Sequence, residues 1–159
     1  MSAANGTMKA LTFVLQGETF AIDAGRVREI LDLVPITEVP NAHPFVPGLI
    51  NVRGRVVPLA DLRVVFGMER PEPDVNTRIV VFEVDIDGEP AISGILADEV
   101  RDVADIDSSS IEPAPKVGMR WRAEFVKGIG RRGDEFIIIP DIERIFASQS
   151  RLLTVAEGA

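Results

Sequence analysis

The chain contains no cysteine, no tyrosine and a single histidine among its 159 residues. Without cysteine it can form neither a disulfide framework nor a thiolate metal site. The histidine, His43, stands in a proline-rich loop, whereas a catalytic histidine needs a nucleophile and an orienting partner, and a metal site needs several ligands. The sequence therefore predicts no catalytic residues, no bound metal and no cofactor.

The chain also has too little positive charge for a typical nucleic-acid-binding protein. Its 17 Lys and Arg residues are outnumbered by 25 Asp and Glu residues, which gives a formal net charge of −8. A protein that binds a duplex presents a basic face that neutralises phosphates. The arginines here are scattered, and the pair Arg131-Arg132 is too small to form such a face. We expect no nucleic-acid partner.

Long apolar runs are missing as well. No run approaches the roughly 20 residues that a membrane-spanning helix requires. The opening stretch, MSAANGTMKA, lacks the apolar segment of a secretion signal. We therefore expect no direct insertion into a membrane and a cytoplasmic location.

What the chain does contain is a series of β-branched runs separated by turns. Residues 78–97 predict a hairpin, because such runs flank Asp87-Gly88, a dipeptide suited to turn positions with positive φ. Residues 48–62 predict two short strands around Gly54. The stretch 67–76 is charged, rich in proline and poor in apolar residues, which is typical of a linker.

The two halves of the chain carry corresponding motifs in the same order. Val27-Arg28-Glu29-Ile30 recurs as Val100-Arg101-Asp102-Val103, Gly48 and Gly54 correspond roughly to Gly128 and Gly133, and Asp61-Leu62 with Phe66 recurs as Asp141-Ile142 with Phe146. Residues 141–148 also predict a helix, which Asp141 can cap. The repeated order predicts an internal duplication of an all-β unit of about 65 residues, too small to bury much core alone.

The stretch GIGRRG gives Gly128, Gly130 and Gly133 the G-x-G-x-x-G spacing of a dinucleotide-binding loop. Such a loop must leave a strand and open a helix, whose N–H groups then meet the pyrophosphate. Here two acidic residues and the β-branched run 136–139 follow instead. The three glycines are therefore interpreted as structural, permitting a tight hairpin turn and its bulge.

The segment GLINVRGRVVPLADLR (48–63) resembles the signature of the CheW family, the chemotaxis coupling proteins. The similarity extends over about residues 10–147. It includes the FAID stretch that begins at Phe20, the GILAD stretch that begins at Gly94, the Pro113-Ala114-Pro115 loop and the GIG stretch that begins at Gly128.

The resemblance implies a mainly all-β fold. Two small five-stranded SH3-like β-barrels would pack around a shared hydrophobic core, followed by a short C-terminal helix. The first barrel would cover roughly residues 10–75 and the second roughly 76–147, with exchange of elements between them left open. Residues 1–9 and 148–159 are expected to form loose termini.

The resemblance also implies a non-catalytic adaptor. Proteins of this family couple the cytoplasmic tip of chemoreceptors, the methyl-accepting chemotaxis proteins, to the regulatory domain of the histidine kinase CheA. A scaffold of the same kind in a different chemosensory pathway, such as one that controls pili or gene expression, is the alternative.

The receptor tip helix is expected in a hydrophobic groove between the barrels. By position, the candidates for that groove are Val27, Ile30, Val100 and Val103, and the alternative for each is a place in the core. Glu29 and Arg53 are expected to pair at a partner interface, and Gly48 and Gly54 to serve backbone geometry. Glu99 stands beside the groove, where members of the family often have glycine, so its carboxylate either alters receptor preference or points to solvent.

Overall fold

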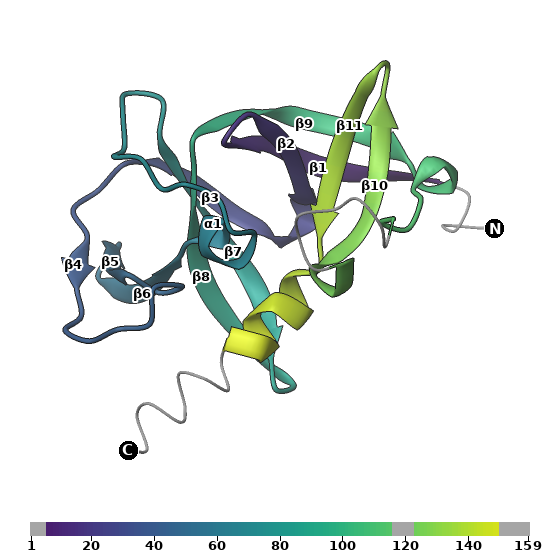
Figure 1. Ribbon diagram of the computed structural model, residues 1–159. Helices are drawn as coiled ribbons and strands as arrows, with labels where there is room; N and C mark the ends of the chain where they lie inside the picture. The colour runs from purple at the N-terminus through teal and green to yellow at the C-terminus, as the bar shows by residue number, and fades with distance from the viewer. Residues whose placement is uncertain (1–5, 116–122, 150–159) are drawn as a thin grey trace.

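The computed structural model describes residues 6–115 and 123–149. Its strands form two sheets, which lie at the upper right and the left of Figure 1. The five-stranded sheet has the order β10-β11-β2-β1-β9. Its strands are β1 (Thr7–Leu15), β2 (Glu18–Asp23), β9 (Glu99–Asp107), β10 (Val126–Arg132) and β11 (Glu135–Pro140).

The six-stranded sheet has the order β3-β7-β8-β6-β5-β4. Its strands are β3 (Val27–Asp32), β4 (Thr37–Glu38), β5 (Gly48–Val52), β6 (Arg55–Ala60), β7 (Arg78–Ile86) and β8 (Glu89–Ala97). Short 3-10 turns η2 (Ala24–Arg26), η3 (Ser108–Ser110) and η4 (Ala123–Phe125) and helix α1 (Leu62–Val65) connect them. The helix predicted near the end of the chain covers residues 142–149.

The predicted hairpins are present, and their turns use the expected residues. Asp87 and Gly88 both have positive φ between β7 and β8, as do Arg53 and Gly54 between β5 and β6. The glycine-rich stretch forms the β10–β11 hairpin, with Gly133 at φ 62° in its turn and a register shift before Gly128. Strand β11 follows these glycines directly, where a phosphate loop would open a helix, so the stretch forms the strand–turn–strand that the sequence predicts.

Each sheet combines strands from both halves of the chain. The β1–β2 hairpin lies in one sheet with β9, β10 and β11, whereas the β7–β8 hairpin lies in the other with β3 to β6. Two parallel pairings join these parts, β11 with β2 and β6 with β8. The division at residues 75 and 76 is therefore not the division between the sheets, because the hairpin that opens each half pairs with strands of the other half.

Two further expectations need correction. One sheet has six strands rather than five, because Thr37 and Glu38 pair with β5. At the matching place of the other sheet, the described residues form a single bridge, Glu112 to Ile129. The expected loose termini included residues that form regular structure. β1 begins at Thr7, which pairs with Asp107, and the last helix extends to residue 149. Residues 1–5 and 150–159 of those termini lie outside the described residues.

The duplication read from the sequence has a structural counterpart. A Cβ added to Gly48 would lie 2.6 Å from Ile36 Cγ2, and one added to Gly128 would lie 2.6 Å from Ile111 Cγ2. The Asp61 N–H donates to the carbonyl of Phe45, and the Asp141 N–H donates to the carbonyl of Phe125. The same close approach and the same backbone bond therefore occur once in each repeat.

The largest apolar cluster lies between the sheets and takes side chains from both. Phe20 of β2 packs against Phe66, with ring centroids 5.3 Å apart, and Phe146 of the last helix packs against Phe45 and Phe82 at 5.2 and 5.8 Å. Each sheet also has a smaller apolar cluster of its own. One surrounds Ile50 and Leu59 of the six-stranded sheet, and the other surrounds Ile106 and Ile137 of the five-stranded sheet. The shared core is the reason that two small β units are stable together.

Candidate functional site

An open pocket lies where β3 and β7 of one sheet face β9 of the other. It is lined by Ile30, Asn76, Arg78, Glu99 and Val100. Two of the four residues predicted for the groove, Ile30 and Val100, therefore meet at one place, although they belong to different sheets and are 70 residues apart in the sequence.

The other two predicted groove residues lie on the same two strands. Val27 is half-buried against the core cluster, as Val100 is, while Ile30 and Val103 are 44% and 57% exposed. Each strand thus has one valine rooted in the core and one aliphatic side chain open to solvent. Burying an exposed aliphatic side chain against a partner removes apolar surface from water and lowers the free energy of the complex. The two exposed residues are therefore the better contact candidates.

The predicted pair of Glu29 and Arg53 is present. Arg53 Nη2 lies 3.2 Å from Glu29 Oε1, with the side chains 82% and 26% exposed. Arg53 has φ 54° and Gly54 φ 84°, and the Asn51 side chain accepts from the Gly54 N–H at 2.8 Å, which fixes the tight turn. The turn therefore presents the guanidinium to solvent, where an ion pair contributes little stability but leaves the charge accessible to a partner.

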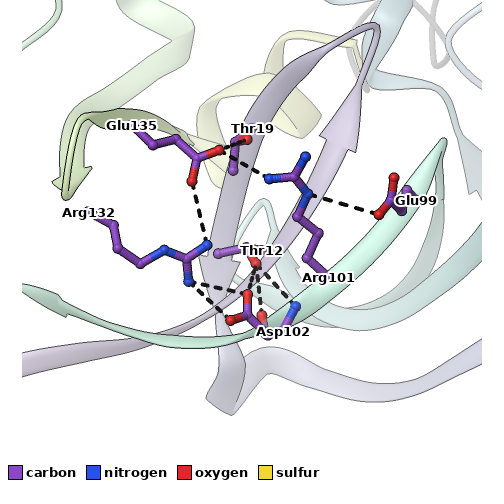
Figure 2. A network of polar contacts seen from close by, with 7 residues as sticks. All are labelled: Thr12, Thr19, Glu99, Arg101, Asp102, Arg132 and Glu135. Atoms are coloured by element: carbon purple, nitrogen blue, oxygen red, sulfur yellow. Dashed lines mark hydrogen bonds and ion pairs between the residues drawn. The ribbon is translucent and has the colours of Figure 1, made fainter.

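The second repeat has a more extensive polar network in place of that single pair (Figure 2). Asp102, the counterpart of Glu29, is bound by Arg132 Nη1 at 3.1 Å, and Arg132 in turn contacts Glu135. The buried Thr12 hydroxyl donates to the Asp102 carboxylate at 2.6 Å and accepts from the Asp102 N–H at 3.2 Å. These contacts occupy the register shift between β1 and β9, so the network joins β1, β9, β10 and β11.

The network lowers the pKa of two carboxyl groups. The Thr12 hydroxyl and then the Arg132 guanidinium hold the pKa of Asp102 below its ordinary value. The Thr19 hydroxyl, followed by the charges of Arg101 and Arg132, does the same for the pKa of Glu135. Both groups are therefore anionic at neutral pH. The network joins the strands through ion pairs and hydrogen bonds and does not supply protons.

Ion pairs also hold the two points where the chain crosses between the sheets. At the first crossing, Arg26 donates to both carboxylate oxygens of Glu143 on the last helix. At the second crossing, Arg63 at the start of α1 lies 3.7 Å from Asp98, and it is buried in a two-point contact with Asp61 at 2.9 Å. These contacts fix the relative placement of the sheets and therefore the shape of the pocket between them.

The sequence did not single out Asn76 and Arg78 as pocket residues. Asn76 belongs to the segment interpreted as a linker, and Arg78 opens β7. Only the pairing of β3 with β7, where Asp32 faces Arg78, brings them to the pocket. Within residues 6–115 and 123–149, no group of three or more potential metal ligands occurs, and no helix is long and apolar enough to cross a membrane.

Comparison with known proteins identifies the family. The model of the CheW-like domain matches residues 9–150. The chain belongs to the CheW-like family. Its CheW-like fold is also seen in the crystal structure of the scaffolding protein TtCheW from Thermoanaerobacter tengcongensis, with a TM-score of 0.77, 34% identity and 88% of each chain covered.

Several CheW-like relatives match over nearly the whole chain. The chemotaxis protein CheW of Klebsiella aerogenes is 34% identical over 143 residues, covering 90% of this chain and 84% of that protein. The chemotaxis protein CheW of Rhizobium meliloti is 29% identical over 147 residues, covering 92% of each chain. Protein PilI of Pseudomonas aeruginosa is 33% identical, but over 89 residues that cover only 55% of this chain and 47% of PilI. The full-length matches favour chemotaxis over the pilus alternative.

Proposed function

We propose that this CheW-like protein is a non-catalytic chemotaxis adaptor that couples the cytoplasmic tips of chemoreceptors to the regulatory domain of the histidine kinase CheA. Membership of a chemotaxis scaffold family over residues 9–150 supports the assignment. The observation that carries the receptor contact is the pocket in which Ile30 of one sheet and Val100 of the other meet. An adaptor at receptor tips acts in the cytoplasm.

The receptor would dock as a helix across that pocket. An amphipathic helix places apolar side chains at i, i+3 and i+4 into a groove. Ile30 and Val100, on strands of different sheets, would receive these apolar side chains, and Glu99 would lie beside them. Ile30 would then lose its exposure to water, and the half-buried Val100 would form part of the floor. Arg53, with Glu29 behind it, would add a charged contact beside β3.

The kinase would contact the outer ends of the two β units. Val56 and Phe136 occupy matching positions in the β5–β6 and β10–β11 hairpins, and both are exposed. Exposed large apolar residues at two separate ends allow one adaptor to contact two neighbours while its pocket holds a receptor. Such a division of surfaces is what coupling requires.

Reconstitution tests the proposal. The purified chain is mixed with a receptor tip fragment and with CheA of the same source, and autophosphorylation of the kinase is measured. We expect the kinase to respond to the receptor only when the chain is added. A chain that binds neither partner and leaves the kinase unchanged contradicts the proposal. Replacing CheA by the kinase of a pilus pathway separates the two pathways, and we expect a response only with CheA.

A further inference from the structure

Glu99 brings an incompletely neutralised carboxylate into the pocket between the sheets. It lines that pocket beside Ile30 and Val100, and its side chain is 53% exposed. Its ion-pair partner, Arg101, has its Nε 4.0 Å from the Glu99 carboxylate, which is the outer limit for such a contact. A carboxylate at that distance keeps most of its charge available to another cation.

Arg101 is held by a different acid. Its Nη1 lies 3.1 Å from Glu135, a carboxylate that also accepts from the Thr19 hydroxyl at 2.7 Å. Figure 2 shows Glu99 at the margin of the network, joined to it through Arg101 alone, while Glu135 lies among several donors. The network therefore directs Arg101 away from Glu99 and toward the middle of the five-stranded sheet.

The other charged residue of the pocket is already occupied. Arg78 Nη1 donates to the carbonyls of Val75 and Thr77, each at 2.9 Å, and its Nε lies 3.4 Å from Asp32. The positive charge of Arg78 is thus shared among three oxygen atoms of this chain. Among the charged side chains that line the pocket, Glu99 is the one whose compensation is weakest.

We infer that Glu99 selects among receptor tips by pairing with a lysine or arginine that the docked helix carries beside its apolar face. The inference rests on the proposed function, because it assumes that a receptor helix occupies this pocket. Closing the pocket with an apolar helix would strip water from the Glu99 carboxylate, which raises the free energy of an unpaired charge. A basic side chain removes that cost, whereas an acidic one adds repulsion, so the position discriminates by charge.

The test measures binding of a receptor tip fragment to three forms of the full chain by isothermal titration calorimetry. These are the unchanged chain, Glu99→Gln and Glu99→Lys. We expect Kd to rise about three- to tenfold for Glu99→Gln and further for Glu99→Lys, with smaller differences at high salt. Changing one basic residue at a time on the receptor helix to Glu should identify a variant that binds Glu99→Lys better than it binds the unchanged chain.

Glu89→Gln is the matched control, because Glu89 is exposed at the opposite end of the β7–β8 hairpin, roughly 26 Å along the strand from the pocket. It should leave Kd unchanged. If the unchanged chain binds the tip and both Glu99 variants bind it with the same Kd as the unchanged chain, the inference is wrong and the proposed function stands. If the unchanged chain does not bind the tip, the proposed function is wrong and the inference falls with it.

Discussion

Arg26, where the chain first crosses from one sheet to the other, is held through two guanidinium nitrogens by Glu143 of the last helix. The position that corresponds to Glu143 in the first repeat is Arg63, which faces Asp98 at the second crossing. The two crossings are therefore held by ion pairs of opposite polarity. Either polarity gives the same attraction between the crossing and the helical segment that it contacts.

The Arg26–Glu143 contact should stabilise the relative placement of the sheets. Its hydrogen bonds raise the pKa of Arg26, and both side chains are about one third exposed, so solvent reduces the gain. We expect Arg26→Gln and Glu143→Gln each to lower the free energy of unfolding by about 1 kcal/mol, with a coupling of about 0.5–1 kcal/mol in a double-mutant cycle. Urea unfolding of the four proteins measures this, and strict additivity of the two changes argues against a direct contact.

Arg53→Glu should abolish coupling without unfolding the protein. The side chain is 82% exposed, so its loss should change the melting temperature by only a few degrees. The new carboxylate would face Glu29 and repel it, which alters the surface beside β3. Receptor control of kinase autophosphorylation is the readout. Arg70→Glu, an exposed change of the same charge in the 67–76 loop, serves as control and should couple normally.

Thr12→Val should weaken the protein more at neutral pH than in acid. Because the folded pKa of Asp102 lies below its ordinary value of 3.8, the stability that this carboxylate contributes is present above that value and is lost as the pH falls through the folded pKa. Removing the Thr12 hydroxyl removes the main cause of the shift. The urea midpoints of the two proteins should differ more at pH near 7 than near 3.

A change in another threonine provides the control for that experiment. Thr37 is exposed in β4 of the other sheet. Thr37→Val should give a difference in midpoint that does not vary with pH. An equal difference for Thr12→Val at both pH values would mean that its hydroxyl acts on packing alone.

Gly48→Ala should destabilise more than Gly17→Ala. The added methyl group at Gly48 would lie 2.6 Å from the Thr37 carbonyl oxygen, a backbone atom that can move only if β4 moves. At Gly17 nothing lies within 4 Å, so the cost is only the positive φ of 80°. We expect about 2–3 kcal/mol for Gly48→Ala and about 1 kcal/mol for Gly17→Ala, measured by chemical unfolding. A reversed order would show that β4 yields easily.

Much of the fold follows from local sequence signals. Asp87-Gly88 and Gly54 mark the hairpins that they form, and the recurrence of Val27–Ile30 as Val100–Val103 corresponds to strands β3 and β9. The exchange of hairpins could not be predicted in this way. The nearly continuous apolar run at the end of β1 shows that both faces of the strand are buried. It does not show that the neighbour of β1 is β9, about 90 residues later.

The same limit applies to the candidate site. The pairing of Arg53 with Glu29 was anticipated from the family resemblance, and it is present. Its counterpart, Arg132 with Asp102, was not anticipated. The glycine-rich stretch around Arg132 predicts a turn, but it does not indicate which acid the arginine contacts. Thr12 gave no signal either, since a threonine within an apolar strand looks the same whether its hydroxyl is bonded or not.

Because of the exchange of hairpins, β1 and β2 are synthesised long before the other strands with which they pair. The β1–β2 hairpin leaves the ribosome early, but β11, which pairs with Phe20 of β2, ends only at Pro140. At about 5–20 residues per second, the ribosome needs about 6–25 seconds to cover that interval. During this time the apolar faces of β1 and β2 lack their final partners, so the nascent chain is exposed to aggregation for longer than a chain of two consecutive barrels would be.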